Sequence, residues 1–205
     1  MKKVGLTGGI ASGKSTSVSI LLENGFKVID SDMIVKNILR EDEEVIRYIE
    51  KEFGNQFVYN NKILKREFGN YIFTYEDERI KYENFIMDKI FNKINEEFSF
   101  HEKNHEKLCI LDAPLLIEKN LHKEMDYVVL IWVSAEEQLK RLIDRDKIDE
   151  ENAIKRINSQ IDIDFKKQFA DFIVDNSKGK EYLRQQIHRL CVILKTLQIG
   201  GISYE

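Results

Sequence analysis

The feature that most constrains the fold is a glycine-rich stretch near the amino terminus, Gly8-x-x-x-x-Gly13-Lys14-Ser15. An apolar, strand-like run at residues 4–7 precedes it, and apolar residues at helical spacing follow it over residues 18–22. A strand, a glycine loop and a helix in this order are the setting in which such a stretch binds phosphate as a P-loop. A glycine-rich turn that contains Lys-Ser by coincidence is the alternative, and the matching segments on both sides argue against it.

Each residue type in the P-loop has a physical role toward a nucleotide. Glycine lets the backbone approach phosphate closely. The amides of residues 10–15 can converge on one anion, aided by the positive end of the helix that begins near Lys14. The Lys14 ammonium can reach the β- and γ-phosphates, and the Ser15 hydroxyl can hold Mg²⁺. We therefore predict that the chain binds a nucleoside triphosphate.

Composition limits the classes of protein to which the chain can belong. With 205 residues, 42% of them hydrophobic, it is long enough for one α/β domain with a good core. Its formal net charge of −4 argues against a general nucleic-acid-binding protein. The longest apolar run, residues 128–133, is too short to span a membrane, and no signal-peptide pattern follows Met1. Two cysteines in apolar stretches favour buried thiols in a reducing compartment, so we expect a cytoplasmic protein.

Strand-like and helix-like segments alternate along the chain. We expect strands at residues 4–7, 26–30, 108–112, 127–133 and 170–175. Helices are expected from a cap at Ser31 or Asp32 to about 39, over 41–53, from 134 to 145, from 149 to about 160 and over 181–197, with a mostly helical stretch at 55–107. Ser134, with Glu137 three residues later, forms a capping box at the start of its helix. This alternation predicts an α/β fold with a parallel five-stranded sheet and helices on both faces. The ligand site of such a sheet lies beyond the carboxyl ends of its strands, where the P-loop should gather with Asp30, Asp32, Asp112 and Asn176.

Three carboxylates are candidates for the chemistry. Asp30 and Asp32 follow the second predicted strand, and for Asp30 a role as a helix cap is an equal alternative. Asp112 ends an apolar strand, where many P-loop proteins keep a carboxylate directed at Mg²⁺, although a turn residue before Pro114 is the alternative. A guanine-nucleotide switch is disfavoured, because the Asn-Lys pairs at residues 61–62 and 92–93 lack the base-reading aspartate two positions later.

Basic residues cluster after the fourth predicted strand. We interpret most of them as solvated helix surface. Arg145 is the exception, because it stands where a helix ends and a polar stretch begins, and on a mobile lid its guanidinium would close over the nucleotide. The cluster consists of Arg141, Arg145, Lys147, Arg156 and Lys166.

Six short motifs in order resemble the dephospho-CoA kinase family over nearly the whole chain. Only the P-loop is specific by itself, but the six together at compatible spacing are hard to obtain by chance. The P-loop motif has Ala11 where the family usually has glycine. The motifs are Leu6-Thr-Gly-Gly-Ile-Ala-Ser-Gly-Lys-Ser-Thr16, Val28-Ile-Asp-Ser-Asp32, Leu111-Asp-Ala-Pro-Leu-Leu-Ile-Glu118, Gln138-Leu-x-Arg-Leu-x-x-Arg145-Asp146, Arg156-x-x-x-Gln160 and Ala170-Asp-Phe-Ile-Val-Asp-Asn176.

The resemblance implies ATP-dependent, Mg²⁺-assisted phosphorylation of the ribose 3′-hydroxyl of dephospho-CoA, which is the last step of coenzyme A synthesis. It implies that Asp32 is the general base, that Arg145 is the lid arginine and that Lys14 is the phosphate lysine. The implied nucleotide contacts are Ala11, Ser12, Gly13, Lys14, Ser15, Thr16, Arg145 and Asn176. The implied acceptor contacts are Thr7, Asp32, Pro114 and Leu115, and Ser15 is the implied Mg²⁺ ligand.

The resemblance also implies a division of one P-loop kinase domain into parts. The core is expected at residues 1–39, 108–145 and 168–205, the helical acceptor region at about 40–107 and the lid at about 146–167. Two positions depart from the family pattern. Met87-Asp88 stands where a His-Pro pair is usual, and Asp162 replaces a proline after the lid glutamine.

Other functions remain open at this point. The nearest alternative is another small-molecule P-loop kinase that acts on a nucleoside or nucleotide. A regulatory P-loop ATPase with a protein partner is a more distant one, and the short chain and the lid-like basic stretch favour the transferase. For the transferase we expect only small-molecule partners, ATP and dephospho-CoA, with no nucleic acid or membrane, in a monomer or small homo-oligomer.

Overall fold

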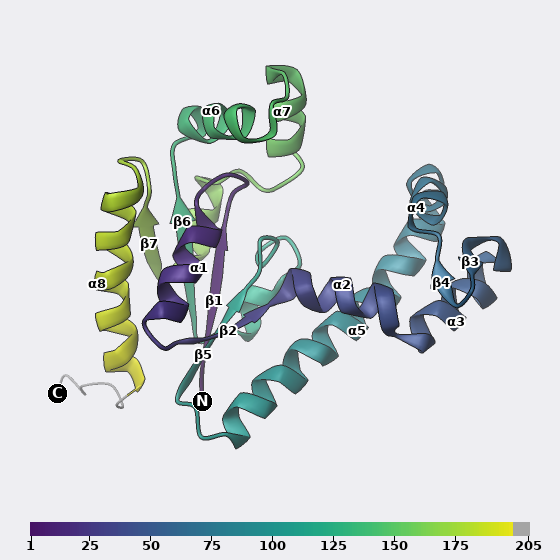
Figure 1. The fold of residues 1–205 in the computed structure, drawn as a ribbon, viewed down its shortest axis with the longest axis horizontal. Coiled ribbons are helices and arrows are strands. Elements are labelled where there is room, and N and C mark those ends of the chain that lie inside the picture. The colour runs from purple at the N-terminus through teal and green to yellow at the C-terminus, as the bar shows by residue number, and fades with distance from the viewer. Residues whose placement is uncertain (199–205) are drawn as a thin grey trace. The chain divides into compact units, whose positions relative to one another are not determined.

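The computed structural model describes residues 1–198 and forms two compact units (Figure 1). Of the described residues, the first unit contains 1–29 and 100–198, and the second contains 30–99. The second unit is therefore an insertion in the chain of the first. No helix within the described residues is long and apolar enough to cross a membrane.

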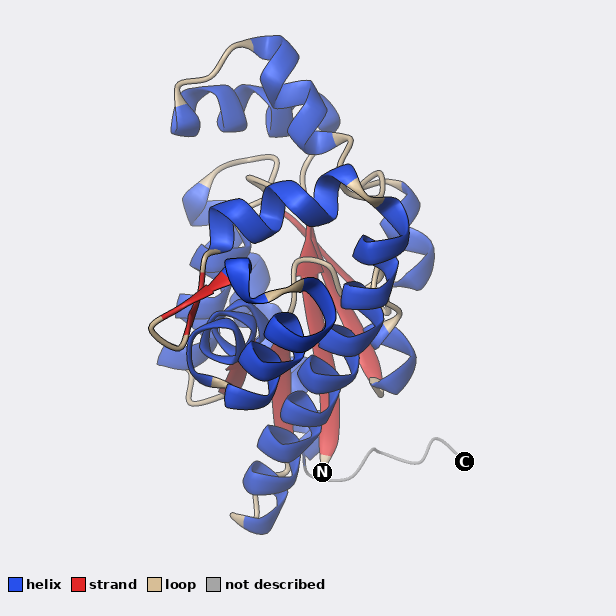
Figure 2. Ribbon diagram, turned by 90° about the vertical axis from the view of Figure 1, so that its right-hand side faces the viewer, coloured by secondary structure: helices blue, strands red, loops and turns tan. Residues whose placement is uncertain are grey.

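The first unit is built on a five-stranded sheet in the order β2-β5-β1-β6-β7. β1 pairs in parallel with β5 and with β6, and β6 pairs in parallel with β7. Figure 2 shows the strands of the sheet running side by side among helices. The predicted parallel five-stranded α/β fold is confirmed. The strands are β1 (Lys2–Gly8), β2 (Lys27–Asp30), β5 (Leu108–Asp112), β6 (Tyr127–Trp132) and β7 (Phe172–Asp175).

Helices α1 (Lys14–Glu23) and α8 (Lys180–Gln198) cover one face of this sheet. Val4 and Leu6 of β1 share a buried core with Leu183 and Ile187 of α8. Full burial of one such side chain stabilises the fold by about 1.5–3 kcal/mol. The strand period of two then directs the intervening residue, Gly5, to the other face, where a side chain would overlap Leu116.

Two helices follow β6 and begin at side-chain caps. α6 (Ala135–Asp146) is capped by Ser134, whose hydroxyl oxygen accepts from the backbone N–H of Glu137 at 3.3 Å, as the capping box predicts. α7 (Glu150–Ile157) is capped by Asp149 and ends earlier than predicted, so Gln160 lies in the segment after it. Both helices lie beyond the carboxyl ends of β1 and β6 (Figure 1). Two short 3-10 helices, η2 (Leu121–Glu124) and η3 (Phe165–Phe169), complete the unit.

The second unit is mainly helical, as predicted. An aromatic cluster forms part of its interior, with Phe53 in edge-on contact with Phe68, Tyr71 and Tyr82. Burial raises the pKa of Tyr82 to about 12, so this phenol stays neutral and behaves as a core residue. The helices of this unit are α2 (Ser31–Glu41), α3 (Glu43–Phe53), α4 (Lys65–Thr74) and most of α5 (Glu76–Lys103).

A small hairpin interrupts the stretch that was expected to be mostly helical. After the 3-10 helix η1 (Asn55–Phe57), β3 (Val58–Tyr59) pairs in antiparallel fashion with β4 (Lys62–Ile63). The two residues between them, Asn60 and Asn61, have φ values of 49° and 57°. Left-handed residues at both turn positions are typical of a tight hairpin, and asparagine tolerates them. The strands are too short for their period to be visible in the sequence.

Candidate active site

The P-loop connects the carboxyl end of β1 with the first turn of α1. The Ser12 N–H donates to the Gly9 carbonyl at 3.1 Å, which closes a tight turn. Within this turn Ala11 has φ 59°, in the left-handed region. The Ile10 N–H, expected to face an anion, instead donates to Gln160 Oε1 at 3.0 Å. Because the Ser12 N–H is also used within the turn, the amides that can face a phosphate are those of Ala11 and of residues 13–16.

Asn176, a predicted nucleotide contact, supports the P-loop backbone. Its side-chain Nδ2 donates to the Ser12 carbonyl at 2.8 Å, and its own carbonyl accepts from Arg141 at 2.9 Å. Gly13 has φ 95°, and a Cβ there would overlap the Asn176 amide nitrogen. Position 13 therefore requires glycine both for its backbone conformation and for space. Arg141 is also more than solvated helix surface, because it is bonded to this support.

Lys14 and Asp112 form an ion pair at the carboxyl ends of β1 and β5. Their side chains are only 14% and 11% exposed, so the attraction between the two charges is weakly screened. Asp112 is therefore more than a turn residue before Pro114. The Ser15 hydroxyl in the first turn of α1 and the Asp112 carboxylate are hard oxygen donors of the kind that Mg²⁺ takes, so the residues present fit the ion.

The carbonyl of Pro114 receives two donors from other parts of the chain. The Thr7 hydroxyl donates to it at 3.1 Å and Lys166 Nζ at 3.3 Å. Lys166 is completely buried and forms an ion pair of 2.7 Å with Glu118. Its interpretation as solvated surface is therefore wrong, because Lys166 joins η3 to the segment after β5. The neighbouring Leu115 is 40% exposed.

Arg145 lies in the last turn of α6 with its guanidinium on the surface. It forms an ion pair of 2.7 Å with Asp146, which also accepts from Arg156 at 2.6 Å. The hydrogen bond from Arg145 lowers the pKa of the Asp146 carboxyl, and the nearby charge of Arg156 acts in the same direction. Asp146 therefore stays ionised and holds both arginines at the beginning of the predicted lid.

Asp30, the last residue of β2, and Asp32 have different local roles in the second unit. Asp30 caps α2, because its Oδ1 accepts from the Met33 N–H at 3.0 Å. The cap is therefore Asp30, the alternative role that the sequence left open for it, and not Ser31 or Asp32. Asp32 lies in the exposed first turn of α2, where the helix dipole favours a negative charge.

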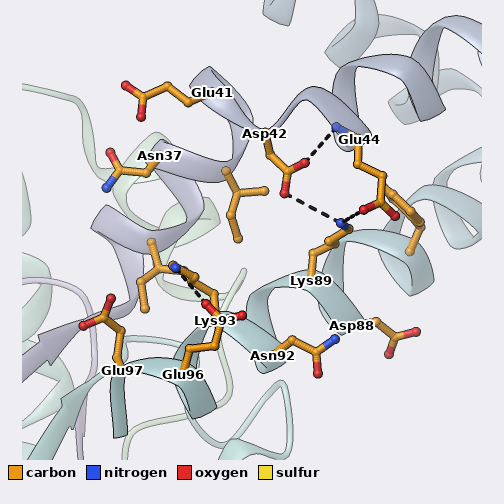
Figure 3. Close-up of a pocket in the computed structure, with 13 residues that line it drawn as sticks. Asn37, Glu41, Asp42, Glu44, Asp88, Lys89, Asn92, Lys93, Glu96 and Glu97 are labelled. Carbon is orange, nitrogen blue, oxygen red and sulfur yellow. Dashed lines mark hydrogen bonds and ion pairs between the residues drawn. The ribbon is translucent and has the colours of Figure 1, made fainter. Parts of the chain in front are cut away.

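A pocket of about 800 Å³ lies within the second unit, between α2 and α5 (Figure 3). Its lining is acidic, and both of its lysines are engaged. Lys89 pairs with Asp42 and Glu44, and Lys93 pairs with Glu96 at 2.8 Å. The lining residues are Ile34, Asn37, Ile38, Glu41, Asp42, Glu44, Phe85, Asp88, Lys89, Asn92, Lys93, Glu96 and Glu97.

Replacing Ala11 by glycine is expected to raise the free energy of unfolding by about 0.5–1 kcal/mol. A side chain in the left-handed region costs about 1–2 kcal/mol, and the greater freedom of glycine in the unfolded chain offsets about 0.4–1 kcal/mol of the gain. Urea unfolding measures the change. The matched control is Ala135→Gly in the first turn of α6, which should lose stability. A loss in Ala11→Gly as well would contradict the expected strain.

The structure brings most of the predicted first-unit residues together, and it adds two that the sequence left without a role. Gln138 Nε2 donates to the Ile10 carbonyl at 2.9 Å, and Gln160 accepts from the amide of the same residue. Both glutamines stand within recognisable motifs, but nothing in their spacing indicated a contact with the P-loop. Arg145 is not bonded to the P-loop in any contact of the described residues, and its partner is Asp146.

A P-loop between the first strand of a parallel sheet and its first helix defines the class of P-loop nucleotide-binding proteins. Two shikimate kinases, from Bacteroides thetaiotaomicron and Acinetobacter baumannii, share this fold, with TM-scores of 0.51 and 0.52 at 15% and 18% identity. Similarity at this level supports the fold alone.

Comparison with protein families narrows the class. The family model described as dephospho-CoA kinase matches residues 2–181, so the chain belongs to the dephospho-CoA kinase family. Dephospho-CoA kinases of Clostridium tetani and Clostridium perfringens are each 43% identical, over 95% and 93% of this chain and 87% and 96% of their own. The solved dephospho-CoA kinase of Campylobacter jejuni is 31% identical, with a TM-score of 0.75, and covers 98% of this chain and all of its own.

Proposed function

We propose that the protein transfers the γ-phosphoryl group of ATP to the ribose 3′-hydroxyl of dephospho-CoA and releases coenzyme A and ADP. The observation that carries this proposal is the match to one kinase family along nearly the whole chain, with an intact P-loop. A bond forms between the 3′-oxygen and the γ-phosphorus, and the bond between that phosphorus and the β–γ bridging oxygen breaks. The hydroxyl proton leaves to a carboxylate.

The nucleotide is assigned to the P-loop. The amides of Ala11 and of residues 13–16 bind its phosphates, while the Ser12 N–H closes the turn on the Gly9 carbonyl. The conformation of Gly13 and the support from Asn176 keep these amides in place. Lys14 exchanges its partner Asp112 for the β- and γ-phosphates. Ser15 holds Mg²⁺ through its hydroxyl, and the ion neutralises charge on the phosphates when it is bound. In a loose transition state, positioning and charge neutralisation supply most of the rate.

The acceptor is assigned to Asp32 and to the segment after β5. Asp32 accepts a hydrogen bond from the 3′-hydroxyl, orients it in line and takes its proton late in the transfer. Thr7, Pro114 and Leu115 contribute contacts to the acceptor, and the exposure of Leu115 leaves its side chain accessible for this. Arg145 leaves Asp146 for the triphosphate as the lid, about residues 146–167, excludes water.

The acidic pocket of the second unit suits the uncharged arm of dephospho-CoA. Six carboxylates line it against two lysines, so it repels the diphosphate but can accept amides and hydroxyls. Asp88, which stands where the family usually has its His-Pro pair, is among the lining residues.

We also assign the protein to the cytoplasm, because Cys109 and Cys191 are buried free thiols. A monomer or small homo-oligomer fits a single-chain site.

An assay of ADP release with several acceptors tests the proposal. Dephospho-CoA should support rapid turnover, whereas adenosine, AMP, CMP and shikimate should not. AMP and adenosine carry the same 3′-hydroxyl but lack the pantetheine arm, so their low rates would indicate that the arm is bound. The control is the Lys14→Ala variant prepared in the same way, which excludes a contaminating kinase. A preference for AMP or CMP would replace the proposal with a nucleotide kinase, and slow hydrolysis with no acceptor effect would indicate a regulatory ATPase.

A further inference from the structure

The backbone N–H and the backbone carbonyl of Ile10, at the tip of the P-loop, each form a hydrogen bond with a glutamine side chain. The amide of Ile10 donates to Gln160 Oε1 at 3.0 Å, and the carbonyl accepts from Gln138 Nε2 at 2.9 Å. Gln138 comes from α6 and Gln160 from the segment after α7, so two separate parts of the first unit converge on one residue. Gln138 is only 3% exposed, which makes its hydrogen bond hard for water to replace.

The residues beside Ile10 are adapted to this arrangement. Gly9 leaves room for the Gln138 side chain, because a Cβ at position 9 would overlap the Gln138 amide nitrogen. Ala11 has a left-handed conformation that an alanine rarely takes. Such a conformation persists only where its surroundings impose it, and the fixed peptide group of Ile10 directly precedes it.

The segment that carries Gln160 is itself anchored to the core of the first unit. The next residue, Ile161, donates its N–H to Glu118 Oε1 at 3.1 Å, and the same oxygen pairs with the buried Lys166 at 2.7 Å. Lys166 also bonds the Pro114 carbonyl that Thr7 contacts. Gln160 is therefore held against the P-loop by a buried anchor and is not a chance surface contact.

We propose that Gln138 and Gln160 are positioning residues that keep the P-loop in its nucleotide-binding conformation before the nucleotide arrives. Both are uncharged amides, so they complete the hydrogen bonds of the Ile10 peptide without adding a charge beside the triphosphate. The loop is then already ordered in the folded protein. Nucleotide binding therefore does not have to supply the free energy of ordering it. The inference rests on nucleotide binding by the P-loop and is independent of the identity of the acceptor.

The test measures the Ile10 amide and nucleotide affinity in the full-length protein. Gln160→Ala should accelerate hydrogen exchange of the Ile10 amide, followed by NMR without nucleotide, on the order of tenfold. It should also weaken ADP binding by calorimetry to a similar extent. Gln160→Glu should keep the slow exchange of the Ile10 amide, because a carboxylate oxygen still accepts its N–H. Gln185→Ala, at an exposed position on α8, is the matched control and should change neither quantity.

Gln138→Ala provides a second, independent variant. It should weaken ADP binding because the Ile10 carbonyl loses the hydrogen bond from Gln138. Unchanged exchange of the Ile10 amide in Gln160→Ala would overturn the inference. Faster exchange with unchanged ADP affinity would also overturn it, since the glutamine would then be merely structural. A loss of thermal stability with normal ADP affinity in both alanine variants leads to the same conclusion. Because ADP binding needs no acceptor, these outcomes stay distinct from a failure of the proposed reaction.

Discussion

Replacing Lys14 by alanine is expected to lower kcat/KM on the order of 10³-fold. The lysine is the charge proposed to neutralise the transferring phosphoryl group, and loss of one preorganised donor to a developing charge costs about 10²–10³-fold. The same change leaves the mostly buried Asp112 carboxylate without this partner. The free energy of unfolding should therefore fall. The expected decrease lies between about 1 kcal/mol, as for the loss of an exposed ion pair, and about 3 kcal/mol, as for the loss of a buried one.

A double variant separates the two effects of Lys14→Ala. Adding Asp112→Asn removes the charge that Lys14 balanced, so the double variant should regain much of the lost stability while activity stays low. Urea unfolding and steady-state kinetics measure the two quantities. Lys27→Ala, which breaks only the exposed pair with Glu106, is the control and should retain normal turnover. If kcat/KM of Lys14→Ala stayed within tenfold of the value for the unaltered protein, the role assigned to the lysine would be wrong.

Replacing Asp32 by asparagine is expected to lower kcat on the order of 10²-fold while ATP affinity stays near normal. A general base contributes about 10²–10⁴-fold, and the loose transition state of phosphoryl transfer places this reaction at the lower end. Asparagine keeps the size of the side chain and can still accept a hydrogen bond, but it cannot take a proton at neutral pH. Rapid-quench measurement of the transfer step, together with calorimetry of ATP binding, distinguishes the two parameters.

Asp30→Asn is the matched control for Asp32→Asn. The Asp30 side chain caps α2 through the Met33 N–H, and asparagine caps a helix as well as aspartate does. This variant loses the same charge two residues away and should keep its stability and its turnover. If Asp32→Asn turned over like Asp30→Asn, Asp32 would not be the general base.

Local patterns predicted the elements of the first unit well. Each predicted strand is present, with its ends within two residues of the expected positions. The Ser134 cap was also predicted correctly. These features depend on hydrophobic period and on capping chemistry, which act over a few neighbouring residues. The hairpin around Asn60 and Asn61 was missed because strands of two residues show no period. The roles of Asp32 and Arg145 and the division into core, acceptor region and lid stay predictions.

The amino-acid sequence by itself was enough to identify the phosphate-binding loop and the alternation of strands and helices, because both depend on patterns among neighbouring residues. Only the tertiary structure decided which distant side chains meet. Lys14 pairs with Asp112, Asn176 supports Ser12, and Lys166 is buried against Glu118, over large separations along the chain. Such pairs form where parallel strands and long connections bring remote segments together, and a lysine or glutamine on a helix carries no local mark of its eventual partner.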